Sequence, residues 1–410
     1  MDKNDLNEIR AEDVTVITSA CVEGANPPCA RVCPFTLDVR AFVGRAEKGK
    51  WQTAFKSYRD AVVFPELVSR LCPAPCEGVC TRESVGGAID LGGLERATVG
   101  FAKNKRRESY VIPQKDKKIA IVGAGAAGLS AALSLSLKKY RVTVFERAGA
   151  WGGALRGHAD FAIFDAEWRE SFSTLDAELR FNAEIADLDA LAGFDAAYIA
   201  TGDGGESFGL LAGFDSELLS TARAGAFLGG GLIGADLMTG VAQGRRASQS
   251  IETYLQTGKP SRPPSQDCDW SPDASEFAHS PRVAATDGGF TEEQAQAEAA
   301  RCLKCDCDKC MQGCEMLRRF HKMPIKIANE VYTDMRANPP FAAHTLTREA
   351  YSCNNCGYCK RECPKSIDAG ELLRLSRRAR VAAESAPPAL HDYWLREMDF
   401  STGEAALIAA

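Results

Sequence analysis

A glycine fingerprint near the middle of the chain constrains its fold more than any other feature. Residues 118–122, KIAIV, form a short apolar strand pattern, and Gly123, Gly125 and Gly128 follow with the spacing G-x-G-x-x-G. Residues 129–137 then have the apolar periodicity of a helix. In such a strand–turn–helix the first glycine allows the tight turn, the second lets the backbone approach a pyrophosphate, and the third lets the helix pack on the strand. The helix N-terminus attracts the phosphate charge.

An acidic residue stands where a dinucleotide site needs one. Residues 141–145 form a second apolar strand pattern, which ends in Glu146, 18 residues after Gly128. An acid at about this distance accepts hydrogen bonds from the adenosine ribose. The pattern predicts a Rossmann-like dinucleotide-binding domain over residues 115–260. An ordinary strand–turn–helix without a ligand is the alternative.

Cysteine is over-represented outside this segment. The 410 residues include sixteen cysteines, of which fifteen form two blocks on either side of the fingerprint and only Cys268 stands alone. The N-terminus has no signal-peptide pattern, so the cysteine spacings indicate metal ligands and not disulfides. A formal net charge of −6 and the lack of a long apolar run argue against nucleic acid and a membrane span. We therefore expect a soluble, cytoplasmic protein of two to four domains.

Three stretches resemble the FAD site of the two-dinucleotide-binding-domain flavoproteins: VFER followed by WGGALR at 151–156, DAAYIATG at 195–202, and a closing segment at 225–255. The closing segment departs from that family in having Gly230-Gly231 where Gly-Asp is usual. The resemblance implies FAD as the dinucleotide. The residues expected to bind it are Gly123, Gly125, Ala126, Ala127, Gly128, Glu146, Arg147, Gly152, Gly153, Leu155, Arg156, Thr201 and Gly202.

The N-terminal cysteines lie in the strings CVEGANPPCARVCP and RLCPAPCEGVCTRE. These strings resemble the N-terminal iron–sulfur domain of the glutamate synthase small subunit and of dihydropyrimidine dehydrogenase. The resemblance implies a helical domain over 1–111 with two [4Fe-4S] clusters. One cluster would bind Cys21, Cys29 and Cys80. The other would bind Cys33, Cys72 and Cys76.

Each of these two clusters lacks a fourth thiolate. The family has a further cysteine where this chain has Gly24, so the first cluster takes an oxygen ligand such as Glu23, is labile, or is absent. The candidate for the second cluster is Glu95, whose alternative role is that of a solvated helix residue. Zinc is the alternative metal for the whole block, since soft thiolate ligands suit both metals.

The C-terminal block contains a ferredoxin signature. Cys353, Cys356, Cys359, Cys363 and Pro364 have the spacing C-x2-C-x2-C-x3-C-P, in which the fourth cysteine binds the other cluster of a pair. By this rule the first three share a cluster with Cys314. Four cysteines of this block remain, namely Cys302, Cys305, Cys307 and Cys310. Three of them would bind a second cluster together with Cys363. One cysteine is then spare, and the spacing does not say whether it is Cys307. Zinc is again the alternative.

The segment between these cysteine groups has helical patterns. It therefore resembles the α-helical ferredoxins of the fumarate reductase and heterodisulfide reductase small subunits more than the compact β-rich type. Thr291 is expected to cap the preceding helix. The fold expected is a multidomain α/β chain, with a linker at 261–290, a dicluster ferredoxin-like domain at 291–385 and a tail at 386–410.

Only about twenty residues separate Gly202 from Ala224, where glutamate synthase relatives carry a complete nicotinamide-binding domain. A βαβ unit needs about thirty residues. The string GGGLIG at 229–234 imitates a second fingerprint, and a separate NAD(P)H site there is the alternative. The domain is therefore expected to bind FAD alone.

These features together predict an electron-transfer oxidoreductase subunit with FAD and three to four [4Fe-4S] clusters, and no acid–base catalytic residue. It would relay electrons between a low-potential donor, either ferredoxin or a nicotinamide-oxidising partner, and a heterodisulfide-reductase-like subunit or module within a larger complex. One alternative is a self-sufficient NAD(P)H-dependent reductase resembling the glutamate synthase small subunit. Another is an assembly scaffold with structural clusters.

Overall fold

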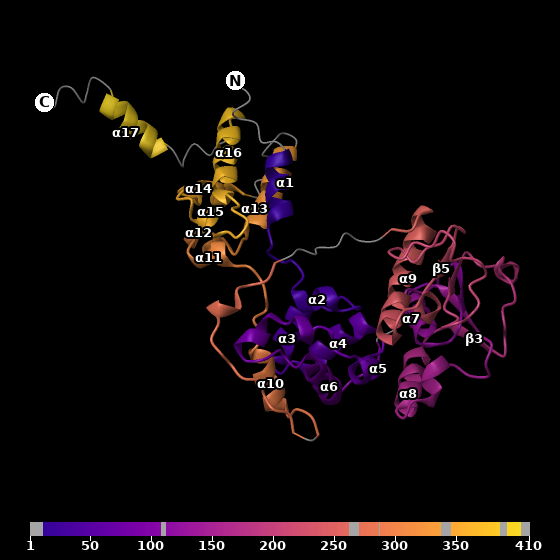
Figure 1. Cartoon of the computed structure of the whole chain (residues 1–410). Coiled ribbons are helices and arrows are strands. Elements are labelled where there is room, and N and C mark those ends of the chain that lie inside the picture. Colours follow the sequence, from indigo (N-terminus) through magenta and orange to yellow (C-terminus); the bar gives the residue numbers. More distant parts are fainter. Residues whose placement is uncertain are drawn as a thin grey trace. The chain divides into compact units, whose positions relative to one another are not determined.

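The computed structural model describes residues 11–107, 112–261, 270–286, 288–337, 346–385 and 392–402. Cys268 and parts of the expected linker and tail lie outside these residues. The chain divides into two compact units (Figure 1). One, the terminal unit, combines residues 1–25 with 306–410, and the other, the central unit, comprises 26–305. These limits differ from the domain boundaries expected from sequence, which stay predictions.

The central unit begins with a bundle of short helices. They are α2 (Pro28–Val32), α3 (Val39–Ala46), α4 (Trp51–Val62), α5 (Pro65–Leu71) and α6 (Leu91–Phe101), with 3-10 turns η1 (Glu77–Val79) and η2 (Thr81–Val85). Asp38 caps α3 and Asp90 caps α6, each by accepting a backbone N–H from the first turn. The helices are amphipathic, and Phe42 and Leu94 are among the side chains fully buried between them.

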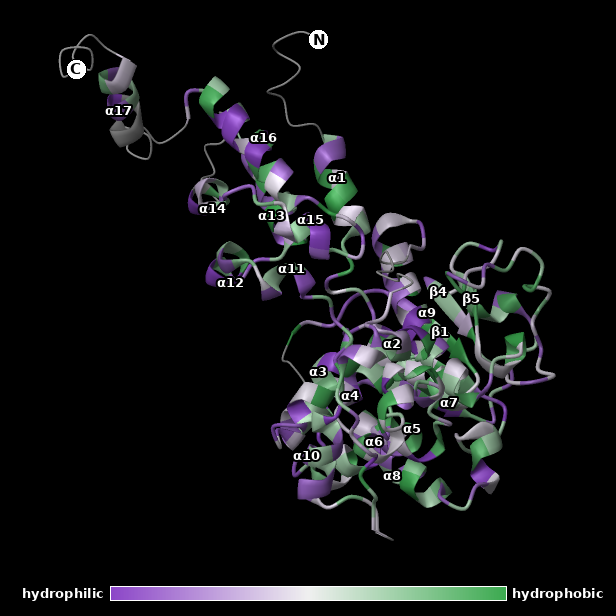
Figure 2. Cartoon of the chain, turned by 60° about the vertical axis from the view of Figure 1, so that its left-hand side comes forward, coloured by the Kyte–Doolittle hydropathy of each residue, from purple (hydrophilic) through white to green (hydrophobic). Residues whose placement is uncertain are grey.

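A five-stranded parallel sheet forms the second part of this unit, in the order β3-β2-β1-β4-β5. Its strands are β1 (Lys118–Val122), β2 (Arg141–Glu146), β3 (Ala177–Phe181), β4 (Ala196–Ile199) and β5 (Ala226–Leu228). The associated helices are α7 (Ala126–Leu137), α8 (Phe161–Phe172) and α9 (Leu237–Thr257), with 3-10 turns η3 (Gly153–Gly157), η4 (Leu188–Leu191) and η5 (Gly230–Ile233). Strands β1, β4 and β5 are predominantly apolar, as Figure 2 shows, because a parallel sheet is covered on both faces. The expected α/β domain beside helical regions is confirmed.

The helical bundle and the sheet region share one hydrophobic core. Helix α8 packs on α5, and the Glu167 carboxylate accepts the backbone N–H groups of Glu66 (2.8 Å) and Leu67 (3.2 Å) in the first turn of α5. These bonds satisfy two amide groups that a helix leaves free at its start. The contact fixes the bundle against the sheet domain.

Residues that follow the sheet domain in the sequence complete the helical bundle. After a short 3-10 turn, η6 (Ala274–Glu276), helix α10 (Glu292–Ala300) packs against α3 and α6 (Figure 1). Thr291 caps α10 with a full capping box, as its sequence predicts. Residues 301–305, directly after α10, therefore lie with the N-terminal helices.

A buried ion pair secures this attachment. Glu298 is fully buried and accepts hydrogen bonds from Arg301 (2.6 Å) and from the backbone N–H groups of Asp90 and Val283 (both 2.9 Å). The Arg301 guanidinium also donates to the carbonyl oxygens of Gly86, Gly87 and Ser280. A buried pair with all its hydrogen bonds satisfied holds a defined geometry.

The described part of the terminal unit is helical. Its helices are α1 (Ala11–Ala20), α11 (Lys309–Gln312), α12 (Glu315–Phe320), α13 (Pro324–Arg336), α14 (Thr347–Ser352), α15 (Tyr358–Glu362), α16 (Ala369–Ala382) and α17 (Asp392–Thr402). Helix α1 packs against α13 and α16, so the start of the chain shares a core with its C-terminal region. A buried ion pair between Asp334 and Arg380 joins α13 to α16. In the described ranges no helix is long and apolar enough to cross a membrane.

Replacing Glu298 by alanine is expected to destabilise the central unit by about 3–5 kcal/mol, because it leaves Arg301 and two backbone N–H groups buried without their carboxylate. The measurement is thermal unfolding of the anaerobic holoprotein. Glu293→Ala, an exposed residue of the same helix, is the matched control. Equal melting temperatures for the two variants would contradict the expectation.

Candidate flavin and iron–sulfur sites

The glycine fingerprint has the close packing that its sequence predicts. Gly123 has a positive φ of 104°, and a Cβ there would lie 2.3 Å from the carbonyl oxygen of Ala200. A Cβ at Gly128 would lie 1.9 Å from the carbonyl oxygen of Gly123. Only glycine fits at either position, so helix α7 packs directly on the turn after β1.

Gly125 differs from its neighbours because a Cβ there would meet nothing within 4 Å. It caps the N-terminus of α7 in an extended conformation, and Ala126 and Ala127 form the first helical turn. The glycine pair 152–153 lies against it, since a Cβ at Gly153 would be 3.3 Å from the Gly125 Cα. The open space in front of the helix N-terminus is where a pyrophosphate would bind.

Glu146 lies at the end of β2 and faces this turn. Its carboxylate accepts the backbone N–H groups of Ala124 (2.7 Å) and Ala148 (2.8 Å). A cavity beside it is also lined by Gly123, Arg147 and Thr201. Each carboxylate oxygen keeps a lone pair for a ribose hydroxyl. Five further residues expected at the FAD site lie as follows: Gly152 and Leu155 are buried, Gly153 and Arg156 are exposed, and Gly202 follows Thr201 with a positive φ.

The closing segment lies over the first turn of α7. The backbone N–H of Gly230 donates to Gln243 Oε1 at 2.8 Å, and a Cβ at Gly230 would be 2.9 Å from the Ala127 Cβ. A Cβ at Gly231 would lie 2.9 Å from the Asp203 amide nitrogen. The departure from Gly-Asp at 230–231 therefore has a local reason, because the backbone of Asp203 takes up the space of a side chain.

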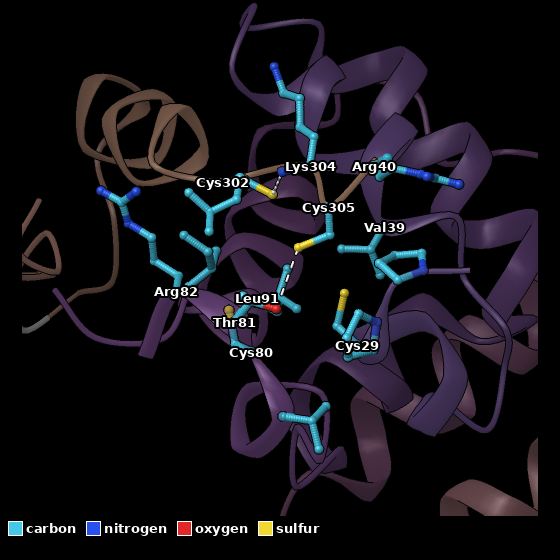
Figure 3. A pocket seen from close by; sticks show the side chains of 15 residues that line it. Cys29, Val39, Arg40, Cys80, Thr81, Arg82, Leu91, Cys302, Lys304 and Cys305 are labelled. Atoms are coloured by element: carbon cyan, nitrogen blue, oxygen red, sulfur yellow. Dashed lines mark hydrogen bonds between the residues drawn. The ribbon is translucent and has the colours of Figure 1, made fainter. Parts of the chain in front are cut away.

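Four thiols of the central unit surround one pocket. Figure 3 shows Cys29, Cys302 and Cys305 directed toward the same space, and Cys80 also lines it. Burial first, and then the charges of Cys302, Cys305 and Cys80, raise the pKa of the Cys29 thiol to about 12. Four close thiolates are unfavourable together unless a cation or cluster compensates their charge.

The local backbone prepares these thiols to act as ligands. The backbone N–H of Lys304 donates to Cys302 Sγ at 3.4 Å, and the Cys305 thiol donates to Thr81 Oγ1 at 3.7 Å. Lys304 and Cys305 both have positive φ, of 58° and 37°. Non-glycine residues adopt this conformation at some energetic cost, which is characteristic of functional loops. The loop therefore orients both sulfur atoms.

A second group in the central unit consists of Cys33, Cys72, Cys76 and Glu95. The thiol of Cys76 has its pKa raised by burial first, and then by the charges of Glu95, Cys33 and Cys72. Glu95 is 9% exposed and accepts a hydrogen bond from the Tyr58 hydroxyl at 2.9 Å. Burial raises the Glu95 pKa to about 7. Glu95 is therefore not the solvated helix residue of the alternative interpretation.

In the terminal unit, four cysteines line another pocket: Cys314, Cys353, Cys356 and Cys359. This is the set that the ferredoxin signature predicts for one cluster. The backbone N–H of Asn355, a residue with φ of 55°, donates to Cys353 Sγ at 3.4 Å. Arg377 from α16 donates to the carbonyl oxygen of Cys353 and so holds the loop.

The remaining cysteines of the terminal unit are Cys21, Cys307, Cys310 and Cys363. Cys310 is buried in the unit's core, and Cys21 and Cys363 pack against that core. The pKa of Cys310 is raised to about 12 by burial and by the charges of Cys307, Cys21 and Cys363. Cys21 thus has its thiol neighbours in this unit, which its position beside Cys29 in the sequence does not reveal.

Within the described residues, no three cysteine, histidine or acidic side chains are arranged to hold a single metal ion. A [4Fe-4S] cluster makes a different demand, because each ligand binds a separate iron at a separate corner. Four thiols spread around one pocket suit that demand. The residues present therefore fit the cluster.

Replacing Gly125 by alanine is expected to weaken FAD binding at least about tenfold, or by about 1.4 kcal/mol, while leaving the fold intact. The new methyl group meets no protein atom, but it fills the space next to the helix N-terminus. FAD content and a flavin titration measure the effect. Gly193→Ala is the control, since its Cβ also meets nothing within 4 Å. Equal FAD affinity in both variants would contradict the assignment.

Replacing Glu95 by alanine is expected to remove one cluster, about four irons, and Glu95→Cys is expected to retain it by supplying a thiolate. Iron and sulfide analysis with EPR of the reduced protein measures the loss. Tyr58→Phe, which removes only the hydrogen bond to Glu95, is the matched control. Full iron content in the alanine variant would show that Glu95 is not a ligand.

Three family models match separate parts of this chain. Residues 3–107 match dihydropyrimidine dehydrogenase domain II with its 4Fe-4S cluster. Residues 118–203 match an FAD-dependent oxidoreductase, and residues 301–368 match a 4Fe-4S dicluster domain. The three regions are those in which the sequence predicts iron–sulfur, flavin and iron–sulfur binding.

Several curated proteins are similar over part of the chain. The NADPH-Fe(3+) oxidoreductase subunit beta of Geobacter sulfurreducens is 34% identical over 121 residues, covering 29% of this chain and 18% of that protein. The NAD-dependent dihydropyrimidine dehydrogenase subunit PreT of Escherichia coli is 32% identical over 164 residues, covering 39% and 38%. The NADPH glutamate synthase small chain of Bacillus subtilis is 36% identical over 125 residues, covering 30% and 25%.

This chain thus spans 18% to 38% of the length of these three relatives. The predicted resemblance to the glutamate synthase small subunit and to dihydropyrimidine dehydrogenase subunits is confirmed. So are the predicted cofactors, FAD and [4Fe-4S] clusters, and the class of flavin and iron–sulfur oxidoreductases to which the similar proteins belong.

Proposed function

We propose that this chain is a cytoplasmic electron-transfer subunit, which passes electrons between a low-potential donor and a reductase partner through FAD and a series of [4Fe-4S] clusters. The donor is ferredoxin or a nicotinamide-oxidising subunit. The acceptor is a heterodisulfide-reductase-like subunit or module. Relatives named as subunits of an NADPH-Fe(3+) oxidoreductase and of an NADP(+)-dependent formate dehydrogenase support assembly into a larger complex.

The observation that carries this proposal is the closeness of the flavin cradle to the group of Cys33, Cys72, Cys76 and Glu95. Asp236, which caps α9 directly after the glycines of the closing segment, is near enough for its charge to act on Cys72. Cys76, in the same thiol group, is in turn affected by the charge of Cys29 in the next group. Cofactor sites arranged in such a series allow electrons to pass from one site to the next.

FAD supplies the exchange between paired and single electrons, and each cluster carries one electron at a time. The chain's own residues bind and position these groups. The N-terminus of α7 and the glycines around it receive the pyrophosphate, and Glu146 receives the ribose. The thiols and Glu95 hold the clusters, and most of these thiols lie in or pack against the core of their unit.

We expect a partner subunit to oxidise the nicotinamide, and this chain to have no nicotinamide site of its own among the described residues. Between β4 and β5, residues 200–225 are all described and contain neither a helix nor a regular strand. Gly230 packs against Ala127 in the first turn of α7, and the segment 229–234 leads into α9. This favours a role in the flavin cradle over a second fingerprint. These features favour an electron-transfer subunit over a self-sufficient NAD(P)H reductase.

The test is rapid anaerobic mixing of the purified holoprotein with NADH, NADPH or reduced ferredoxin. We expect reduced ferredoxin to bleach the flavin rapidly and both nicotinamides to act at least about a hundredfold more slowly. The Gly125→Ala variant, low in FAD, serves as the control for flavin-dependent absorbance. Rapid bleaching by either nicotinamide would favour the self-sufficient reductase.

A redox titration followed by EPR tests the scaffold alternative. Relay clusters should be reduced within the range of known [4Fe-4S] proteins, about −700 to +450 mV, at potentials that the donor can reach. Clusters that stay oxidised even at about −600 mV would contradict the proposed relay.

A further inference from the structure

The two units contain the same cysteine turn. Residues 29–38 read CARVCPFTLD, and residues 359–368 read CKRECPKSID. In each, a short helix ends at the second cysteine, and the N–H of the residue three positions later donates to that cysteine's carbonyl oxygen, at 3.0 Å in Thr36 and 2.9 Å in Ser366. Both residues have positive φ, of 50° and 53°.

The aspartate that ends each turn also has the same role. Asp38 caps α3 by accepting the N–H of Ala41 at 3.0 Å, and Asp368 caps α16 by accepting the N–H of Glu371 at 3.0 Å. The match therefore extends over sequence, backbone conformation and capping. It makes Cys29 equivalent to Cys359.

A second pair of segments corresponds in the same way. Cys302 and Cys305 have the spacing C-x2-C, as do Cys353 and Cys356. In each, the residue before the second cysteine is left-handed and donates its N–H to the first sulfur at 3.4 Å. Within each unit, this pair lines one pocket together with the equivalent cysteine of the turn.

A third correspondence completes the pattern. Cysteines at 72, 76 and 80 match those at 307, 310 and 314 in order. The middle members, Cys76 and Cys310, are both buried. The last members, Cys80 and Cys314, both line the pocket of their unit's C-x2-C pair.

We propose that Cys302 and Cys305 bind a [4Fe-4S] cluster together with Cys29 and Cys80, and not a cluster of the C-terminal dicluster region. The second cluster of that C-terminal region is instead bound by Cys21 together with Cys307, Cys310 and Cys363. The chain thus holds two equivalent dicluster modules, the first of which takes its C-x2-C pair from more than two hundred residues further along the sequence.

The assignment accounts for every cysteine that the structure describes. Fifteen thiols and Glu95 form four groups of four, so no cysteine in the C-terminal block is spare. Gly24 is not a missing ligand in this arrangement. It has φ of 72°, and its N–H donates to Asp306 Oδ1 at 3.0 Å, so it shapes the turn after Cys21 within the terminal unit. Glu95 and Cys21 hold equivalent positions as the fourth ligands of their groups.

The proposal gives the relay a definite order and rests on the proposed function in that respect. From the flavin cradle, electrons would pass to the group with Cys72 and then to the group with Cys305. Cys307, a ligand of the other module, follows Cys305 after one residue. A peptide of this length spans at most about 7 Å between its end Cα atoms. The cluster ligands Cys305 and Cys307 of the two modules are therefore joined by a short stretch of the covalent chain.

The test counts irons in the anaerobically purified full chain, which holds about sixteen if four clusters are present. The double variants Cys302→Ala with Cys305→Ala, and Cys29→Ala with Cys80→Ala, should each lose about four irons. The quadruple variant that combines all four changes should also lose only about four, because the four residues serve one cluster. EPR of the reduced protein should lack the same signal in all three variants.

The matched control combines Cys302→Ala and Cys305→Ala with Cys314→Ala and Cys353→Ala, and should lose about eight irons. Retained FAD shows that each variant has folded. A loss of about eight irons in the first quadruple variant, or none in the Cys302 and Cys305 variant, would overturn the assignment. Iron in the unaltered protein with no response to donors would instead defeat the proposed function alone.

Discussion

The structure depends on keeping cysteine thiols, which repel one another when charged, close together in positions that are mostly partly or fully buried. Burial is the main cause of the raised thiol pKa in both units, and neighbouring thiolates add to it, as at Cys29 and Cys310. Without a cluster these groups stay protonated near neutral pH, because the charged form is penalised twice. Iron binding supplies the compensating charge and releases the protons. Folding of the helical regions and cluster assembly are therefore linked, as in other small domains whose core contains metal ligands.

The backbone limits this cost by arranging hydrogen bonds and turns around each sulfur. Ala74, Lys304 and Asn355 are left-handed, and each lies two positions after a cysteine. Such a turn directs backbone N–H groups toward the sulfur, and these favour the thiolate over the thiol. The conformation costs energy in a residue with a Cβ, so it persists because the packing around it is fixed.

The flavin fingerprint and the ferredoxin signature could be predicted from sequence because both are local. Gly123, Gly125 and Gly128 act within one turn, and their geometry agrees with their spacing. Cys353, Cys356 and Cys359 lie around one pocket, as their spacing predicts. A short segment of chain contains all the information that fixes such sites.

The partners of Cys29 could not be found from spacing. Cys302 and Cys305 follow the whole sheet domain in the sequence, and helix α10 brings them to Cys29 by packing on the N-terminal helices. The buried pair of Glu298 and Arg301 fixes this packing. Proximity in sequence instead favours Cys21, which the fold places in the other unit. One signal was available in the sequence, namely the likeness of CARVCPFTLD to CKRECPKSID. Its meaning depends on knowing that both turns are followed by capped helices.

A module whose ligands come from distant parts of the chain has a consequence for assembly. Cys29 and Cys80 precede the flavin domain, and Cys302 and Cys305 follow it, so their shared site is incomplete until the sheet domain between them has folded. The Cys33 group needs only residues that precede that domain. The flavin domain is thus enclosed between the two halves of one cluster site, and the cluster, once bound, acts as a cross-link that closes a loop of more than two hundred residues. Closing a loop of this length restricts the unfolded chain strongly, in the way that a long-range disulfide does. The cluster farther from the flavin cradle would therefore stabilise the flavin domain as well as conduct electrons away from it.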